Sequence, residues 1–137
     1  MALQVYDNVF RTTVICVDKY ENRILSGRLY NSYYKTGINF GSTMELLRSL
    51  EGMLEEMNCP QSFSSKRLFR PIGEKTVFEA STETENKGKL ATFSLRILFR
   101  QNASWQGSVV WSEGKQEESY RSVLELLLLI DSALVST

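Results

Sequence analysis

The chain is similar to itself when it is shifted by 80 positions, and this internal similarity restricts the fold more than any other feature. Gly27 then corresponds to Gly107, and the segment Ser42 to Leu47 corresponds to Ser122 to Leu127 without a gap. Self-similarity at a fixed offset is typical of a supersecondary unit that occurs more than once in a chain. We therefore expect two copies of one unit.

Each copy has the pattern of several strands followed by one helix. Residues 10–17 are rich in β-branched and apolar side chains, residues 23–34 alternate between apolar and polar, and residues 38–40 form a short third segment. In the second copy, residues 93–99 and 105–111 alternate in the same way. An alternation with period two indicates strands that bury one face, so each copy is predicted to contain a hairpin, a further short strand and a helix.

The two predicted helices begin with the same local signal. Ser42 precedes Glu45 by three positions, and Ser122 precedes Glu125 by three positions, in each case ahead of an apolar run. In such a capping box the serine oxygen accepts from the third helical N–H, while the glutamate reaches back to the serine N–H. Capping explains these acids better than a paired catalytic carboxylate does.

The fold class predicted from these patterns is α+β, with two tandem β-β-β-α repeats and an antiparallel sheet that carries its helices on one face. Residues 1–137 are expected to form a single domain, which suits the length. Repeat one covers about 10–57, connecting strands and a loop cover about 60–89, and repeat two covers about 90–137. A pseudo-two-fold axis is expected to relate the repeats, and the connecting strands are expected to extend the sheet of the second one.

The strand glycines Gly27 and Gly107 occupy the same place in the two predicted hairpins. Glycine inside a strand usually marks a bulge, a bend or a close approach of another backbone. A ligand contact is the functional interpretation of these glycines, and curvature of the sheet is the structural one that we favour.

Composition excludes several classes of function. The chain has no histidine, which removes imidazole catalysis and histidine-containing metal sites. No phosphate-binding loop, nucleophile elbow or metal-ligand spacing is present, so we predict no catalytic residues, no metal and no cofactor. The N-terminal residues lack the layout of a signal peptide and the apolar run Leu126 to Ile130 is too short to cross a bilayer, which favours a cytoplasmic protein without a membrane partner.

Single-stranded nucleic acid is the first candidate ligand, because basic side chains interleaved with aromatic ones on a sheet can contact phosphates and stack on bases. The candidate residues are Lys66, Arg67, Arg70, Arg96, Arg100, Tyr33 and Tyr34, with Arg96 and Arg100 expected on one face of their strand. Trp105 and Trp111 add aromatic surface, and their burial beneath the helices would remove much of this support. Lys+Arg and Asp+Glu are both 16, and this balance does not favour a strong electrostatic attraction to nucleic acid.

The segment Thr36 to Leu50 resembles the last strand and helix of the Whirly and Pur-alpha type of single-strand-binding proteins. The resemblance implies curved sheets packed through paired helices, with bases bound on the sheet surfaces. The corresponding strand of the second copy, Glu117 to Tyr120, is acidic and departs from that pattern. The segments Leu98 to Trp111 and Tyr120 to Leu126 also resemble small uncharacterised proteins of gut clostridia, a resemblance that implies no activity.

A protein partner is the alternative, and it is suggested by a difference between the two helices. Where the first helix has Arg48 and Ser49, the second has Leu128 and Leu129, with Leu124 alongside. An outward apolar face of this kind is expected to be covered. The cover is either the segment between the repeats or a second molecule, and the second case is a homodimer. The sequence therefore predicts a non-catalytic binding protein that binds single-stranded nucleic acid. The alternative is a protein–protein interaction or regulatory module that acts through the apolar face of this helix or through a sheet edge.

Overall fold

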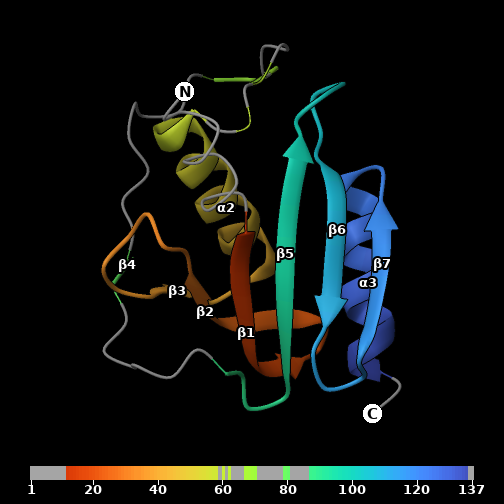
Figure 1. Ribbon diagram of the computed structural model, residues 1–137. Helices are drawn as coiled ribbons and strands as arrows, with labels where there is room; N and C mark the ends of the chain where they lie inside the picture. Colours follow the sequence, from red (N-terminus) through yellow and green to blue (C-terminus); the bar gives the residue numbers. More distant parts are fainter. Residues whose placement is uncertain are drawn as a thin grey trace.

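The computed structural model describes residues 12–58, 60, 62, 67–70, 79–80 and 87–135. Within these residues it contains seven strands and two helices in one α+β arrangement (Figure 1). In chain order they are β1 (Thr12–Glu21), β2 (Ile24–Tyr30), β3 (Ile38–Phe40), α2 (Thr43–Met57), β4 (Glu79–Ala80), β5 (Ala91–Phe99), β6 (Gln106–Trp111), β7 (Gln116–Tyr120) and α3 (Val123–Val135). The predicted α+β class is confirmed.

The strands form one sheet in the order β4-β3-β2-β1-β5-β6-β7, and all pairs of neighbouring named strands are antiparallel. Its centre is the β1–β5 pair, where Val14 lies opposite Ser94. We call residues 12–57 the first half and residues 91–135 the second half. Each half is a three-strand meander followed by a helix, with its first strand at the centre of the sheet.

The short strand β4 does not lie beside the second half, where the connecting strands were predicted to be. It pairs with β3 of the first half, with Ala80 opposite Ile38. The expectation that this segment extends the sheet of the second half is wrong for β4. In the strand order, β4 lengthens the sheet at the β3 edge of the first half, at the opposite end from β7.

Both strand glycines lie next to a bulge. Gly27 is opposite Val17, beside a shift in register in β1, and Gly107 is opposite Ile97, beside a shift in β5. A Cβ atom on Gly27 would lie 1.9 Å from the carbonyl oxygen of Cys16, and one on Gly107 would lie 2.0 Å from that of Arg96. The glycines therefore mark a bulge and a close approach of the neighbouring backbone, which only glycine allows.

The two predicted capping serines are in place, with one change in the partner of each glutamate. At α2, the N–H of Glu45 donates to Ser42 Oγ (3.1 Å) and the Glu45 carboxylate accepts from the N–H of Gly41 (2.7 Å), one residue before the cap. The corresponding bonds at α3 are from Glu125 N–H to Ser122 Oγ (3.2 Å) and from Arg121 N–H to Glu125 Oε1 (2.8 Å). At both helix starts the serine therefore satisfies the third helical N–H, and the glutamate satisfies the N–H of the residue before the cap.

The helices pack on one face of the sheet, and their buried residues form a single cluster with the alternate residues of the central strands. Its largest fully buried members include Ile15, Leu29, Phe93, Leu95, Ile97, Leu46, Leu50, Met53, Leu126 and Ile130. Figure 1 shows α3 behind β6 and β7. No helix among the described residues is long and apolar enough to span a membrane.

Candidate interaction surfaces

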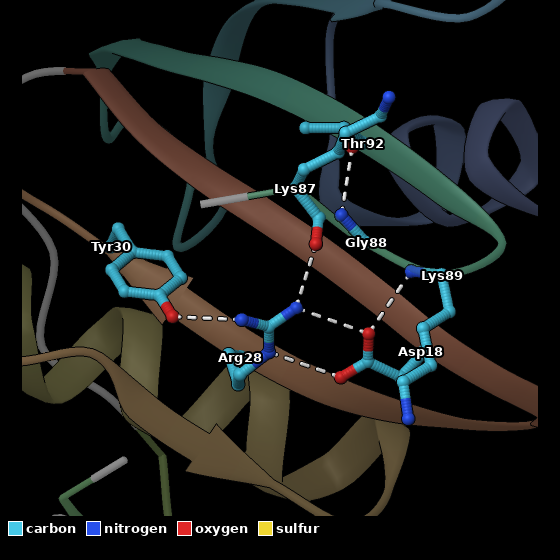
Figure 2. Close-up of polar contacts among 7 residues, drawn as sticks. All are labelled: Asp18, Arg28, Tyr30, Lys87, Gly88, Lys89 and Thr92. Carbon is cyan, nitrogen blue, oxygen red and sulfur yellow. Dashed lines mark hydrogen bonds and ion pairs between the residues drawn. The ribbon is translucent and has the colours of Figure 1, made fainter. Parts of the chain in front are cut away.

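The open face of the sheet, which is the face opposite the helices, carries an almost buried ion pair between Arg28 and Asp18 (Figure 2). The guanidinium makes a bidentate contact, from Nε to Oδ2 at 3.1 Å and from Nη2 to Oδ1 at 3.2 Å. It also donates to the Tyr30 hydroxyl at 2.9 Å and to the Lys87 carbonyl at 2.7 Å. The hydrogen bonds that Arg28 donates to Asp18 hold the pKa of Arg28 above its ordinary value, so the group stays charged.

This ion pair fastens the segment before β5 across the open face. Besides the bond to the Lys87 carbonyl, the Lys89 N–H donates to Asp18 Oδ1 at 3.1 Å and the Gly88 N–H donates to Thr92 Oγ1 at 2.9 Å (Figure 2). Cys16 is paired with Arg28 on one side and Thr92 on the other, and it is fully buried. Because the donors and acceptors of the cluster are used within the chain, the cluster serves the fold and is not an anion site.

The predicted nucleic-acid residues do not gather on one surface. Arg67 and Arg70 are exposed in a stretch without regular structure, and Lys66 lies outside the described residues. Arg96 is exposed on the open face, whereas Arg100 is 3% exposed on the helix side. The prediction that Arg96 and Arg100 share a face is wrong.

The bulge in β5 is the reason. The register shifts between Ile97 and Phe99, which reverses the alternation of side chains for the rest of the strand. Arg100 therefore points toward α2, where it donates to the Pro60 carbonyl at 2.7 Å and to Glu51 Oε2 at 3.2 Å. A guanidinium held in this way is not available to a phosphate.

The aromatic candidates lie mainly on the helix side of the sheet. Trp105 is 4% exposed and donates its indole N–H to Glu51 Oε1 at 2.9 Å. Tyr33 and Tyr34 are half-buried against the core, with ring centroids 5.0 Å apart in an edge-to-face arrangement. Trp111 is also half-buried against the core. These positions remove much of the sequence-based support for a base-stacking surface.

Helix α3 exposes an apolar stripe, which we define as Leu124, Leu128 and Val135. Their exposed fractions are 66%, 58% and 59%. Leu129 is different, because it is half-buried and packs against the core. In a helix it lies about 140° around from Leu124, which turns it toward the sheet. Of the three residues predicted for an interface, Leu124 and Leu128 are exposed and Leu129 is not, and Val135 is exposed on the same side of α3.

The acids beside the stripe are paired with groups of the same chain. Asp131 accepts from the Tyr20 hydroxyl and from Arg23 Nη1 at 3.2 Å. Glu125 is paired with Arg121, whose hydrogen bond lowers the pKa of Glu125 to about 2. The surroundings of the stripe therefore present little uncompensated charge.

A cavity of about 190 Å³ lies between α3 and the sheet, and we call it the α3 cavity. Its apolar walls are Phe93, Val109, Trp111, Leu129 and Ala133, and its polar groups are Gln116, Glu118 and Ser132. In the first half, the positions of Glu118 and Ala133 are taken by Ile38 and Met53, which are 3% and 1% exposed. Both are apolar side chains that are larger than their counterparts and are buried in the core.

Sequence reasoning found the stripe on α3 but neither the Arg28–Asp18 cluster nor the α3 cavity. The signal for the cavity was present as the exchange of Met53 for Ala133 between corresponding positions. No group of three or more acidic or thiol side chains that could hold a metal ion occurs in the described part of the chain. Comparison with protein-family models, curated proteins and solved structures gave no significant match.

Proposed function

We propose that the chain is a duplicated β-β-β-α unit with a pseudo-two-fold axis, and that it is a non-catalytic binding protein that pairs with a second copy of itself through the α3 stripe. The observation that carries the function is the exposure of Leu124, Leu128 and Val135 on one side of α3. The duplication explains why the corresponding side of α2 is the natural reference for this surface.

The duplication is supported by the pairing of the strands. The Val14–Tyr30 pair recurs 80 positions later as Ser94–Val110. Across the centre of the sheet, Val14 lies opposite Ser94 itself. A two-fold axis would require one residue to face its own counterpart where the axis crosses the sheet, and this pair meets that requirement.

The difference between the two helices supports α3 as the interface. The residues of α2 that correspond to Leu128 and Val135 are Arg48 and Glu55, both exposed and charged. A solvated helix carries charges on its outer side, as α2 does. The uncharged stripe on α3 instead leaves apolar surface in water, at a cost that burial against another molecule would remove.

A second copy is the occupant that the charges favour. A two-fold interface brings the same patch of both subunits together, so an unpaired charge in the patch would be repelled by the same charge on the other copy. The stripe carries no charge, and its neighbours Asp131 and Glu125 are already paired within the chain. Because three side chains supply little area, we expect a dissociation constant on the order of 10–100 µM.

Sedimentation velocity between about 5 and 500 µM tests this proposal. The unmodified chain is expected to shift from monomer to dimer with concentration, whereas Leu128→Arg, which places the residue of α2 at that position, stays monomeric. Met44→Arg is the matched control, because Met44 is 64% exposed on α2 and corresponds to Leu124. A chain that remains monomeric at the highest concentration, or equal effects of the two substitutions, would contradict the proposal.

Binding of single-stranded nucleic acid is the second candidate, and one observation favours it. Arg67, Arg70 and Arg96 are exposed, and within the described residues no acidic side chain pairs with them. Retention of a single-stranded oligonucleotide at about 50 mM salt, falling as salt rises, would support this function. Arg96→Ala should then weaken binding without changing the sedimentation behaviour, which separates the two candidates.

A further inference from the structure

We propose that the α3 cavity binds a small organic cation with an apolar body, of the arylmethyl- or alkylammonium class. The inference is independent of the pairing of two copies, because the cavity lies on the inner side of α3 and the stripe lies on its outer side. Its walls combine five apolar side chains with one carboxylate, one amide and one hydroxyl, and include no basic residue.

The carboxylate of Glu118 stands on the helix side of the sheet. Glu118 lies opposite Val109 on β6, and Gln116 lies opposite Trp111. Directly paired residues of antiparallel strands share a face, and Val109 is buried on the face that α3 covers. Two polar side chains of β7 are therefore placed at the mouth of an apolar cavity.

Glu118 is exposed on the edge strand β7, and within the described part of the chain no hydrogen bond or ion pair involves its carboxylate. The two other acids near α3, Glu125 and Asp131, are both paired. A carboxylate without a partner at the mouth of a cavity attracts a cation, and the half-buried indole of Trp111 in the same wall can stabilise it by a cation–π interaction.

The size of the cavity limits the apolar body of the ligand. An engineered apolar cavity on the order of 150 Å³ accommodates benzene, and the α3 cavity measures about 190 Å³. A single aromatic ring with one methylene and one ammonium group is therefore a suitable probe. For so few atoms we expect a dissociation constant on the order of 1 mM.

The test is a titration of the full chain with benzylammonium, followed by NMR through the Trp111 indole N–H and the Ala133 amide. Benzyl alcohol and phenylacetate serve as the neutral and anionic probes. We expect benzyl alcohol to bind about tenfold more weakly than benzylammonium and phenylacetate not to bind. Binding of phenylacetate as tight as that of benzylammonium would overturn the charge assignment.

Two substitutions locate the site. Ala133→Met introduces the residue of the first half, fills the cavity and should abolish binding without lowering the melting temperature. Glu118→Gln should lower the affinity for benzylammonium to that for benzyl alcohol, and it should leave the affinity for benzyl alcohol unchanged. Glu117→Gln is the matched control, because Glu117 lies opposite Val110, on the open face, and should bind like the unmodified chain.

The opposing explanation for Glu118 is that an inward charge on β7, an edge strand of the described sheet, discourages pairing with another chain. In that case Glu118→Gln self-associates and benzylammonium shows no saturable binding up to about 20 mM. That result would overturn the proposal, as would unchanged binding in Ala133→Met.

Discussion

Arg100, directly after β5, donates to the Glu51 carboxylate of α2 at 3.2 Å and thereby ties the second half of the sheet to the helix of the first half. Tyr20 corresponds to Arg100 and Asp131 corresponds to Glu51 when the chain is shifted by 80 positions. These two residues make the reciprocal contact between the first half and α3. Each helix therefore has an acid at the same position that holds the hairpin of the other half. The two contacts differ in burial, because Arg100 is 3% exposed whereas Arg23, the cation on Asp131, is 73% exposed.

This difference predicts unequal effects of removing the two acids. Glu51→Ala removes the carboxylate that the Arg100 guanidinium and the Trp105 indole N–H share. Arg100 keeps the Pro60 carbonyl and the Glu55 carboxylate as partners, so we expect a loss of about 2 kcal/mol in the free energy of unfolding, mainly from the unpaired indole N–H and the weakened ion pair. Asp131→Ala should cost about 1 kcal/mol or less, because its ion pair is solvated. Urea denaturation of the two variants measures both values. Equal losses would show that burial does not separate the two contacts.

Asp18 is predicted to control how well the segment before β5 protects Cys16. Asp18→Ala removes both bonds of the Arg28 guanidinium to the carboxylate and the bond from the Lys89 N–H. We expect a destabilisation of about 3 kcal/mol and a faster reaction of the Cys16 thiol with a disulfide reagent. The assay is made in a Cys59→Ser background, so that Cys16 is the one thiol present. A thiol rate unchanged by Asp18→Ala would contradict the covering role of residues 87–90.

The sequence predicted the elements more successfully than it predicted their contacts. Strand alternation, the Ser42 and Ser122 caps and the apolar stripes of the helices are local signals, and local structure follows them. Whether Arg100 faces solvent depends instead on a bulge after Ile97, and no local sequence pattern predicts that bulge. The same limit applies to Arg28 and Asp18, whose contact requires the register of β1 against β2.

The candidate site was predictable only in part. The apolar outer side of α3 followed from helical spacing, because Leu124 and Leu128 are four positions apart. The α3 cavity depends on the summed volumes of side chains from several elements, and such a sum cannot be made before the elements are placed. Its one sequence signal is Ala133, which stands where the first half has the larger Met53. This signal is visible only when corresponding positions of the two halves are compared.

The glycines beside the bulges are predicted to be the least replaceable small residues of the sheet. Gly27→Ala and Gly107→Ala would each place a Cβ atom within 2.0 Å of a carbonyl oxygen of the neighbouring strand, so the strands must move apart. We expect each to cost about 2–3 kcal/mol. In Gly41→Ala, the control, the new Cβ meets only Glu45 Oε1 at 3.4 Å, and its effect should stay within about 0.5 kcal/mol. Thermal unfolding measures all three, and similar losses for Gly27 and Gly41 would refute the close-approach argument.

Because of Cys16, the free energy of unfolding is expected to depend on pH in the alkaline range. Burial raises the pKa of the Cys16 thiol to about 11, above its value of 9.0 in an unstructured chain. Folding therefore favours the neutral thiol, and this contribution to stability is complete below about pH 8.5. It is lost as the pH rises toward 11, because the unfolded chain releases the proton first. In the Cys59→Ser background, the free energy of unfolding should fall by about 1 kcal/mol more between pH 8 and pH 10 than in the same background carrying Cys16→Ala. Parallel pH profiles for the two chains would mean that the Cys16 thiol ionises as readily in the folded state as in the unfolded one.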